Sequence, residues 1–212
     1  MRRLVIAIVV LGGLGVGGDV GARSWAEGQI ENRARAELPP AASVSAHIRA
    51  FPFVPALLLA GKVSETAGHF RNVRAGGLTF SDVDVELHGV RINRGKLLHE
   101  RAVELVDVDE GTVTVDIVVA QLGKAVGLGV VAANGQLKVT VAGVSATANL
   151  SVHDNALVVD VAGVVKRIPI PQTRLVPCAT SASVLAGRVR LSCTIHDVPP
   201  GLLGAANRRL GQ

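Results

Sequence analysis

Aromatic residues are scarce in this chain of 212 residues: tyrosine is absent, and aromatic residues make up 2% of the sequence. Membrane-spanning β-barrels carry girdles of aromatic side chains where they meet the two surfaces of the bilayer. The long amphipathic strands described below would suit an envelope β-barrel or a structural β-protein, and this alternative stays open. The missing aromatic girdles argue against it.

Blocks of like charge are also missing. The chain has 22 Lys and Arg against 17 Asp and Glu, a net charge of +5, and its basic residues are dispersed. Nucleic-acid-binding proteins gather Lys and Arg on one face, so we expect no nucleic-acid partner. A mildly basic surface instead fits contact with anionic headgroups at a membrane surface.

Motifs of enzymes and metal centres are missing as well. The six histidines have none of the spacings of metal-ligating motifs, and the chain contains no Gly-x-Ser-x-Gly nucleophile elbow. Asp82, Asp84 and Glu86 alternate with apolar residues, which places them on the solvent face of a strand rather than around a cation. We therefore expect no catalytic residue, no metal and no cofactor.

The longest apolar run, Leu4–Val16, follows Arg2 and Arg3. Its 13 residues are short for a bilayer-spanning helix, which needs roughly 20, but are typical of a signal peptide. Small residues before and at Ala22 would allow cleavage there. We predict that residues 1–22 are a signal peptide or an N-terminal membrane anchor, and that residues 23–212 form a single domain. This domain would be exported to the periplasm or cell envelope.

Most of the remaining chain alternates between apolar and polar residues, as half-buried β-strands do. In the strand before Val90 the apolar set changes parity at Gly89, which predicts a β-bulge at this glycine. Gly143 is expected to act in the same way. A turn at Asp154-Asn155 would place the apolar residues 148, 150 and 152 opposite 161, 159 and 157.

Helical patterns are few. The Ser24–Leu38 segment has a stripe of Trp25, Ile30, Ala34 and Leu38, with Glu27, Glu31 and Arg35 on the opposite side. Short helices are also expected at Pro55–Ala60 and Val118–Val126, and the Pro200–Leu210 segment could fill the interior. The sequence therefore predicts an α+β fold: a strongly curved, mainly antiparallel β-sheet wrapped around one or more helices.

The two cysteines flank a predicted hairpin. A turn at Leu185-Ala186 sets Cys178 opposite Cys193, and both strands are amphipathic in that register. Residues directly opposed in an antiparallel pair lie within disulfide range, and an exported protein meets oxidising conditions. We predict a Cys178–Cys193 disulfide; two buried free thiols are the alternative.

Residues 51–90 carry a family pattern. It consists of Phe-Pro-Phe-Val-Pro at 51–55, the apolar run at 56–59, Gly61-Lys62, and Gly-Leu-Thr-Phe-Ser-Asp-Val-Asp-Val-Glu-Leu-His-Gly-Val at 77–90. This pattern resembles the LmeA-like family of secreted actinobacterial phospholipid-binding proteins, which commonly have Gly-Phe-Pro-Phe-Leu at the first motif. The resemblance implies a tubular lipid-binding fold and a non-enzymatic role.

The resemblance also implies the partners and the biological process. An anionic phospholipid is the expected ligand, and the expected process is assembly of lipoglycans such as lipomannan and lipoarabinomannan, with an envelope glycosyltransferase as a candidate partner. A glycan-processing accessory enzyme is a further alternative, against which the absence of a recognisable carboxylate pair argues.

Two groups of residues are candidates for contact with the lipid. An apolar group would line a groove for the acyl chains, with ordinary core packing as the alternative; it consists of Phe51, Phe53, Leu57, Leu58 and Leu59. A basic group would meet the headgroup, because guanidinium forks suit phosphate oxygens, with a solvated basic face as the alternative. The basic group consists of Arg71, Arg74, Arg91, Arg94 and Lys96.

Overall fold

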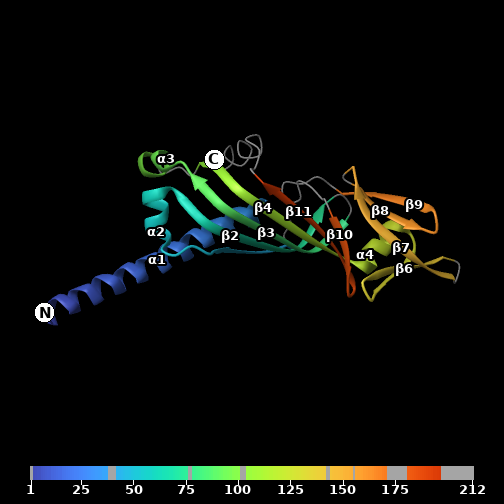
Figure 1. The fold of residues 1–212 in the computed structure, drawn as a ribbon, viewed down its shortest axis with the longest axis horizontal. Coiled ribbons are helices and arrows are strands. Elements are labelled where there is room, and N and C mark those ends of the chain that lie inside the picture. Colours follow the sequence, from blue (N-terminus) through green and yellow to red (C-terminus); the bar gives the residue numbers. More distant parts are fainter. Residues whose placement is uncertain are drawn as a thin grey trace.

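The computed structural model describes residues 2–37, 42–75, 78–100, 104–141, 144–154, 156–170 and 181–196. The molecule is elongated: a long β-sheet forms its middle, a second β-sheet lies at one end, and short helices lie at the other end of the long sheet, where the N-terminal helix projects beyond them (Figure 1). Among the residues described, every strand pairing is antiparallel. The expected mainly antiparallel architecture with few helices is therefore confirmed, but the strands are divided between two sheets instead of forming one.

The larger sheet has six strands in the order β1-β2-β3-β4-β11-β10. Their bounds are β1 Ser43–Ile48, β2 Lys62–Ala75, β3 Leu78–Ile92, β4 Leu105–Val118, β11 Arg188–His196 and β10 Ser181–Leu185. The three central strands have 14 or 15 residues each, so they extend for about 45 Å. This length lets one sheet reach from the helical end of the molecule to the smaller sheet.

The smaller sheet is a meander of five strands. Their bounds are β5 Gly129–Ala133, β6 Gln136–Val141, β7 Val144–His153, β8 Ala156–Val161 and β9 Val164–Pro169. Ala148, Leu150 and Val152 of β7 lie opposite Val161, Val159 and Leu157 of β8, as the sequence predicts. Gly143, where a change of parity was expected, lies outside the described residues.

Helices occupy few residues. They are α1 Arg2–Glu37, α2 Phe53–Pro55, the π-helical η1 Ala56–Ala60, α3 Arg94–His99 and α4 Val119–Val126. The second half of α1, η1 and α4 fall where helices were expected, and α2 lies at the start of the expected Pro55–Ala60 helix. α3 replaces a predicted polar connection and begins after Asn93, whose side chain accepts a hydrogen bond from the Lys96 N–H. No helix among the described residues is both long enough and apolar enough to cross a membrane.

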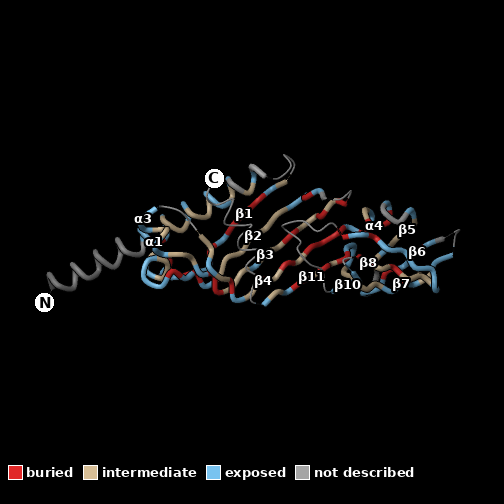
Figure 2. The backbone as a smooth tube through the Cα atoms, turned by 90° about the horizontal axis from the view of Figure 1, so that it is seen from above, coloured by how far each residue is buried: buried red, intermediate tan, exposed pale blue. Residues whose placement is uncertain are grey.

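The buried apolar residues form two separate clusters. The large cluster joins both sheets and α4, and it includes Phe80, Leu137 and Leu191, each at most 1% exposed. The small cluster lies near α2 and consists of Ile48, Ala50, Phe53, Val63, Val90 and Val108. Buried segments therefore occur in both sheets as well as beside α2 (Figure 2).

Gly89 changes the parity of β3 without an inserted residue. On either side of it His88 pairs with Glu110 and Val90 with Val108, so the register with β4 is unchanged and the predicted bulge is wrong. Gly89 instead has a φ of 62°, and this left-handed backbone conformation changes which face of the sheet the following apolar side chains occupy without an inserted residue. A side chain could not replace glycine here, because its Cβ would collide with the Asp109 carboxylate.

The β10–β11 hairpin differs from the expected register by two residues. Val184 lies opposite Val189, where the predicted Leu185-Ala186 turn would have placed Gly187. The observed turn is Ala186-Gly187, with Gly187 at a φ of 73°. A shift of two residues keeps every side chain on its face, so the predicted amphipathic pairing of Val184 with β11 is retained.

Candidate functional site

The short helices α2, η1 and α3 lie together at the end of the large sheet from which α1 projects, and we call this group the tip (Figure 1). Phe53, which is 6% exposed, and Leu57 pack into the small cluster. Phe51 and Leu59 are 70% and 74% exposed, and Leu58 is also exposed. The structure thus divides the predicted apolar group: two members pack inward and three face outward.

Asp19 of α1 holds the tip in place. Its carboxylate accepts hydrogen bonds from the N–H groups of Phe53, at 3.0 Å, and Val54, at 2.6 Å. These donors begin α2, where a helix leaves its first N–H groups without partners of its own and favours negative charge. Asp19 is 5% exposed, so this contact is part of the interior. The sequence marks Asp19 only as the charge that follows the apolar run.

Farther along α1, two more carboxylates bind the open edge of the large sheet. Glu27 accepts a hydrogen bond from the Ile48 N–H at 2.7 Å, and Glu31 accepts one from the Ala46 N–H at 3.0 Å. β1 is an edge strand, whose outward N–H groups would otherwise have no acceptor within the sheet. The two carboxylates therefore cover an edge that could pair with another chain.

These contacts reverse the predicted orientation of α1. Trp25 is 69% exposed and Ile30 is exposed too, whereas Glu27 and Glu31 lie against β1. The helix itself was expected, but its Trp25 stripe does not face the core. The reason is that an unpaired strand edge requires hydrogen-bond acceptors more than it requires apolar cover.

Most cations near the tip already have carboxylate partners. Arg91 binds Asp107 and Asp109, Lys62 lies 3.3 Å from Asp109, and Lys96 lies 3.1 Å from Glu104. The hydrogen bond from Lys62 holds the pKa of Asp109 below its ordinary value, and that from Lys96 does the same for the pKa of Glu104.

Arg94 differs from these cations. Its guanidinium donates to the carbonyl oxygen of Leu59, and among the described residues no carboxylate pairs with it. Arg71 and Arg74 lie elsewhere on β2. Lys62 is the β2 residue paired with Arg91, and Arg71 lies nine residues after Lys62 along this strand, about 30 Å away. The predicted basic group is therefore not one site.

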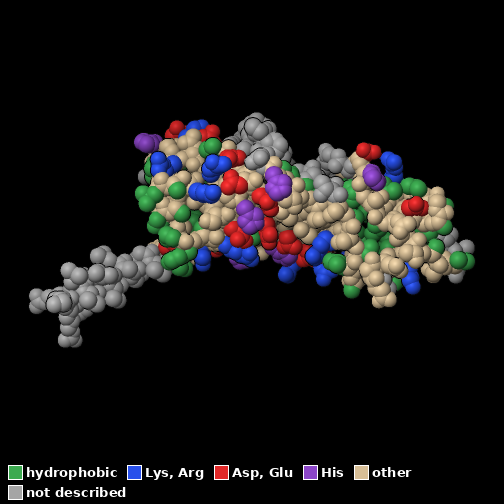
Figure 3. Space-filling model, viewed as in Figure 1, with side chains coloured by type: hydrophobic (Ala, Val, Ile, Leu, Met, Phe, Trp, Pro, Cys, Tyr) green, Lys and Arg blue, Asp and Glu red, His purple; other side chains and the backbone are tan. Residues whose placement is uncertain are grey.

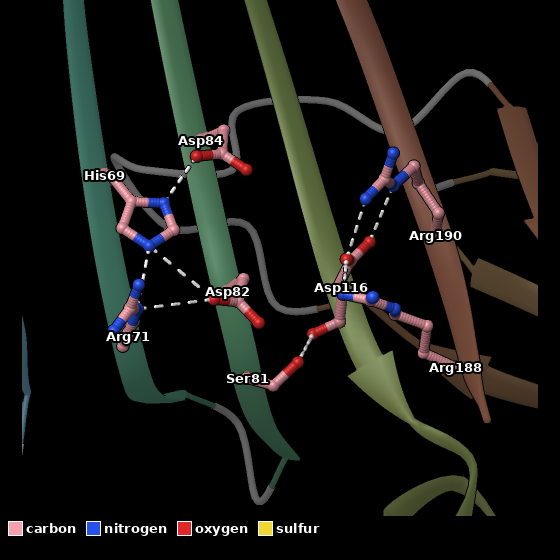
Figure 4. A network of polar contacts seen from close by, with 8 residues as sticks. All are labelled: His69, Arg71, Ser81, Asp82, Asp84, Asp116, Arg188 and Arg190. Carbon is pink, nitrogen blue, oxygen red and sulfur yellow. Dashed lines mark hydrogen bonds and ion pairs between the residues drawn. The ribbon is translucent and has the colours of Figure 1, made fainter. Parts of the chain in front are cut away.

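One face of the large sheet carries a polar network (Figures 3 and 4). Asp116 is buried and binds Arg190 at 2.8 and 2.9 Å and Arg188 at 3.0 Å. The hydrogen bonds from Arg190 hold the pKa of Asp116 below its ordinary value of 3.8, although burial acts in the opposite direction. Sequence reasoning missed Asp116. The available signal was that Arg188 and Arg190 lie two residues apart, and therefore on the same face of a neighbouring strand.

The same network continues across β3 and β2. His69 lies 2.5 Å from Asp84, and the Arg71 side chain lies 3.7 Å from Asp82 and donates to His69. Asp82 and Asp84 thus lie on the polar face, as predicted, and bind cross-strand partners. The described residues contain no cluster of three or more side chains that could hold a metal ion.

On the opposite, apolar face two rows of directly paired residues cross five strands. The first row is Ala46, Gly68, Val85, Val113 and Cys193. The second row is Ile48, Thr66, Leu87, Gly111 and Ile195. We call these ten residues the mid-sheet rows. Paired residues share a face, so each row is continuous.

The boundary between the two clusters runs between the mid-sheet rows. Val85 packs against the large cluster and Leu87 against the small one, and both are only partly buried. The Phe70 ring lies against Gly68, where an added Cβ would be 3.2 Å from the ring. Five of the ten residues are buried, and the other five, Gly68, Thr66, Val85, Leu87 and Ile195, are only partly buried. This face is therefore mainly apolar, continuous with both clusters, and only partly covered by the described residues at Val85 and Leu87.

Cys193 is buried in β11 within the first of these rows. Cys178 lies outside the described residues, so the Cys178–Cys193 disulfide stays a prediction. The Pro200–Leu210 segment also lies outside the described residues.

Comparison with known proteins identifies one family. A family model described as LmeA-like phospholipid-binding matches residues 17–208, most of the chain. Comparisons with curated proteins and with solved structures find no significant match. The family match agrees with the pattern at residues 51–90, and its first residue lies two positions before Asp19.

Proposed function

This chain belongs to the LmeA-like phospholipid-binding family, and we propose that it holds a phospholipid in the cell envelope without changing it chemically. The lipid's acyl chains would lie on the mid-sheet rows, and its headgroup would lie toward the tip. The protein would then act as a carrier or a presenter of lipid and not as an enzyme.

The incompletely covered apolar face carries this proposal. Val85 and Leu87 stand on the long sheet between the two clusters and are only partly buried, so they present apolar surface next to both clusters. An acyl chain supplies the apolar atoms that would cover them, and each buried CH₂ group contributes about 0.8 kcal/mol.

Arg94 supports the placement of the headgroup. It is a cation at the tip without a carboxylate partner among the described residues, and a guanidinium matches the geometry of phosphate oxygens. Arg91 and Lys96 are already neutralised by Asp107, Asp109 and Glu104. Selection of an anionic phospholipid would therefore depend on Arg94 more than on the other basic residues.

We place the protein outside the cytoplasmic membrane because of its basic N-terminus and the apolar run that follows. We also propose that the lipid it holds serves lipoglycan assembly, with an envelope glycosyltransferase as partner; this step rests on the family resemblance alone. Cells that lack the protein should then contain less lipomannan and lipoarabinomannan in total extracts.

The direct test is mass spectrometry of lipid that co-purifies with the full chain. We expect a phospholipid in near-stoichiometric amount. Leu87→Trp should displace it, because the indole would occupy the surface on which the acyl chain lies. Val131→Trp is the matched control, since Val131 is 60% exposed on β5 of the smaller sheet. Equal lipid content in both variants, or no lipid in the parent chain, would reject the proposal.

A further inference from the structure

The tip exposes four large apolar side chains. They are Phe51, Leu58, Leu59 and Leu98, and they are 70%, 40%, 74% and 55% exposed. The bond from Arg94 to the Leu59 carbonyl joins α3 to η1, so these side chains belong to one end of the molecule. Single exposed apolar residues are ordinary, whereas a group of this size at one end indicates an interaction surface.

The chain enters the folded body at the same end. Asp19 binds the start of α2, and α1 continues through Ala22 without interruption. Val16, the last residue of the apolar run, precedes Asp19 by three residues, which is about 4.5 Å along a helix axis. The run therefore ends close to the start of α2, at the same end of the molecule as the tip.

Asp19 also bears on the fate of the N-terminal segment. Cleavage after Ala22 would remove it and leave the N–H groups of Phe53 and Val54 without this acceptor. The family match likewise begins at residue 17 and includes residues 17–22. Both observations favour an N-terminal segment that remains attached as an anchor.

We propose that the tip lies on a phospholipid bilayer, with its four exposed side chains in the interface and the Leu4–Val16 run retained and inserted beside them. This inference rests on the proposed function, which names phospholipid as the ligand, and adds where the molecule meets the membrane. The long sheet would then point away from the bilayer and place the mid-sheet rows in continuity with the lipid surface.

Apolar contact and not charge holds the tip on the bilayer. Lys62, Arg91 and Lys96 are paired with carboxylates, which leaves Arg94 as the cation available to a phosphate among the described basic residues of α3 and its neighbours. Added salt screens exposed charges but not apolar burial. Docking should therefore persist when the ionic strength is raised.

Tryptophan fluorescence can test this orientation. The only tryptophan is removed by Trp25→Phe, and the full chain then receives one probe, Leu59→Trp at the tip or Val164→Trp in β9 at the opposite end, where Val164 is 73% exposed. Each protein is reconstituted into phosphatidylcholine vesicles with brominated acyl chains, which quench tryptophan on contact. We expect the Leu59→Trp probe to be quenched several-fold more strongly than the Val164→Trp probe.

Equal quenching of the two probes, or no quenching of the Leu59→Trp probe, would overturn the proposal. A second pair uses Leu98→Trp as the probe and adds Leu58→Asp, which should reduce its quenching, or Val165→Asp in β9, which should not. Circular dichroism verifies the fold of each variant. In protein isolated from the envelope, intact mass should show that Asp19 is present; a mature N-terminus at Arg23 would overturn retention.

The proposed function and the docking can fail separately. If the parent chain carries no lipid but the Leu59→Trp probe is quenched, the holding of lipid is wrong and docking stands. If lipid co-purifies while both probes remain unquenched, the docking is wrong and the proposed function stands.

Discussion

The two apolar clusters are built in different ways. The large cluster consists of side chains from long strands of both sheets and from α4, which fill the space between them. The small cluster has six buried residues, and carboxylates of α1 hold the short segments around it through backbone N–H groups. Packing thus stabilises the body of the molecule, while hydrogen bonds position the tip and leave four of its large apolar side chains facing outward.

The largest effect should come from the same truncation made in each cluster. Phe80→Ala empties a site that is 0% exposed in the large cluster and should lower the free energy of unfolding by about 4 kcal/mol. Phe53→Ala should lower it by about 2 kcal/mol, because the short α2 segment can collapse into the space. Urea unfolding of the two variants measures both values. An equal loss would contradict the view that the tip is packed less tightly.

Asp19→Ala tests whether hydrogen bonds position the tip. Two N–H groups would lose their acceptor, so we expect a loss of about 2 kcal/mol that is confined to the tip. Hydrogen exchange should accelerate at Phe53 and Val54 and remain unchanged at Leu191 in the large cluster. Glu86→Ala, at an exposed position of β3, is the control and should alter neither. Faster exchange throughout the chain would show that α1 supports the whole fold.

Strand pairing could be predicted from the sequence where two signals agree. The β7–β8 register follows from two amphipathic strands and an Asp-Asn turn, and the structure has it unchanged. In the β10–β11 hairpin the turn was misplaced, and a pattern of period two cannot distinguish registers that differ by two residues. The faces of Val184 and Val189 were therefore right although their partners were wrong.

The tip could be predicted only in part, because exposure there depends on contacts between distant segments. An apolar run such as Leu57–Leu59 does not reveal which of its members pack inward. The orientation of α1 depends on the N–H groups of β1, which are far away in sequence. Likewise, Arg91 and Arg94 are alike in sequence, and only the fold gives one of them carboxylate partners.

Lowering the pH should weaken the body of the molecule more than the tip. The pKa of Asp116 is lower in the folded chain than its ordinary value of 3.8. Its ion pairs therefore contribute their full stability above this ordinary pKa, and the contribution is lost as the pH falls through the lowered pKa of the folded state. Its carboxylate is 3% exposed, and Asp116→Asn should remove about 1.5 kcal/mol of stability at pH 7 and flatten the decline below about pH 4. The pKa of Asp109 near the tip is also lowered, but this carboxylate is exposed. In chemical unfolding from pH 7 to pH 2, Asp109→Asn should therefore follow the parent chain, and a flattened profile for this variant would contradict the contrast.

The smallest expected effect separates a paired cation at the tip from an unpaired one. Arg91→Ser and Arg94→Ser each remove one positive charge, so long-range attraction to an anionic bilayer falls equally in both. Of the two, Arg94 has no carboxylate partner among the described residues and can contact a headgroup phosphate. This contact should contribute about 1 kcal/mol to binding of the anionic bilayer, which is roughly a fivefold change in partition.

The measurement is the partition of the full chain between anionic and neutral vesicles, at low salt and again at high salt. Because salt screens the shared long-range part, the Arg94→Ser variant should retain a weaker anionic preference than the Arg91→Ser variant when salt is raised. Equal partition of the two variants at high salt would show that the tip responds to net charge and that Arg94 makes no contact with the headgroup.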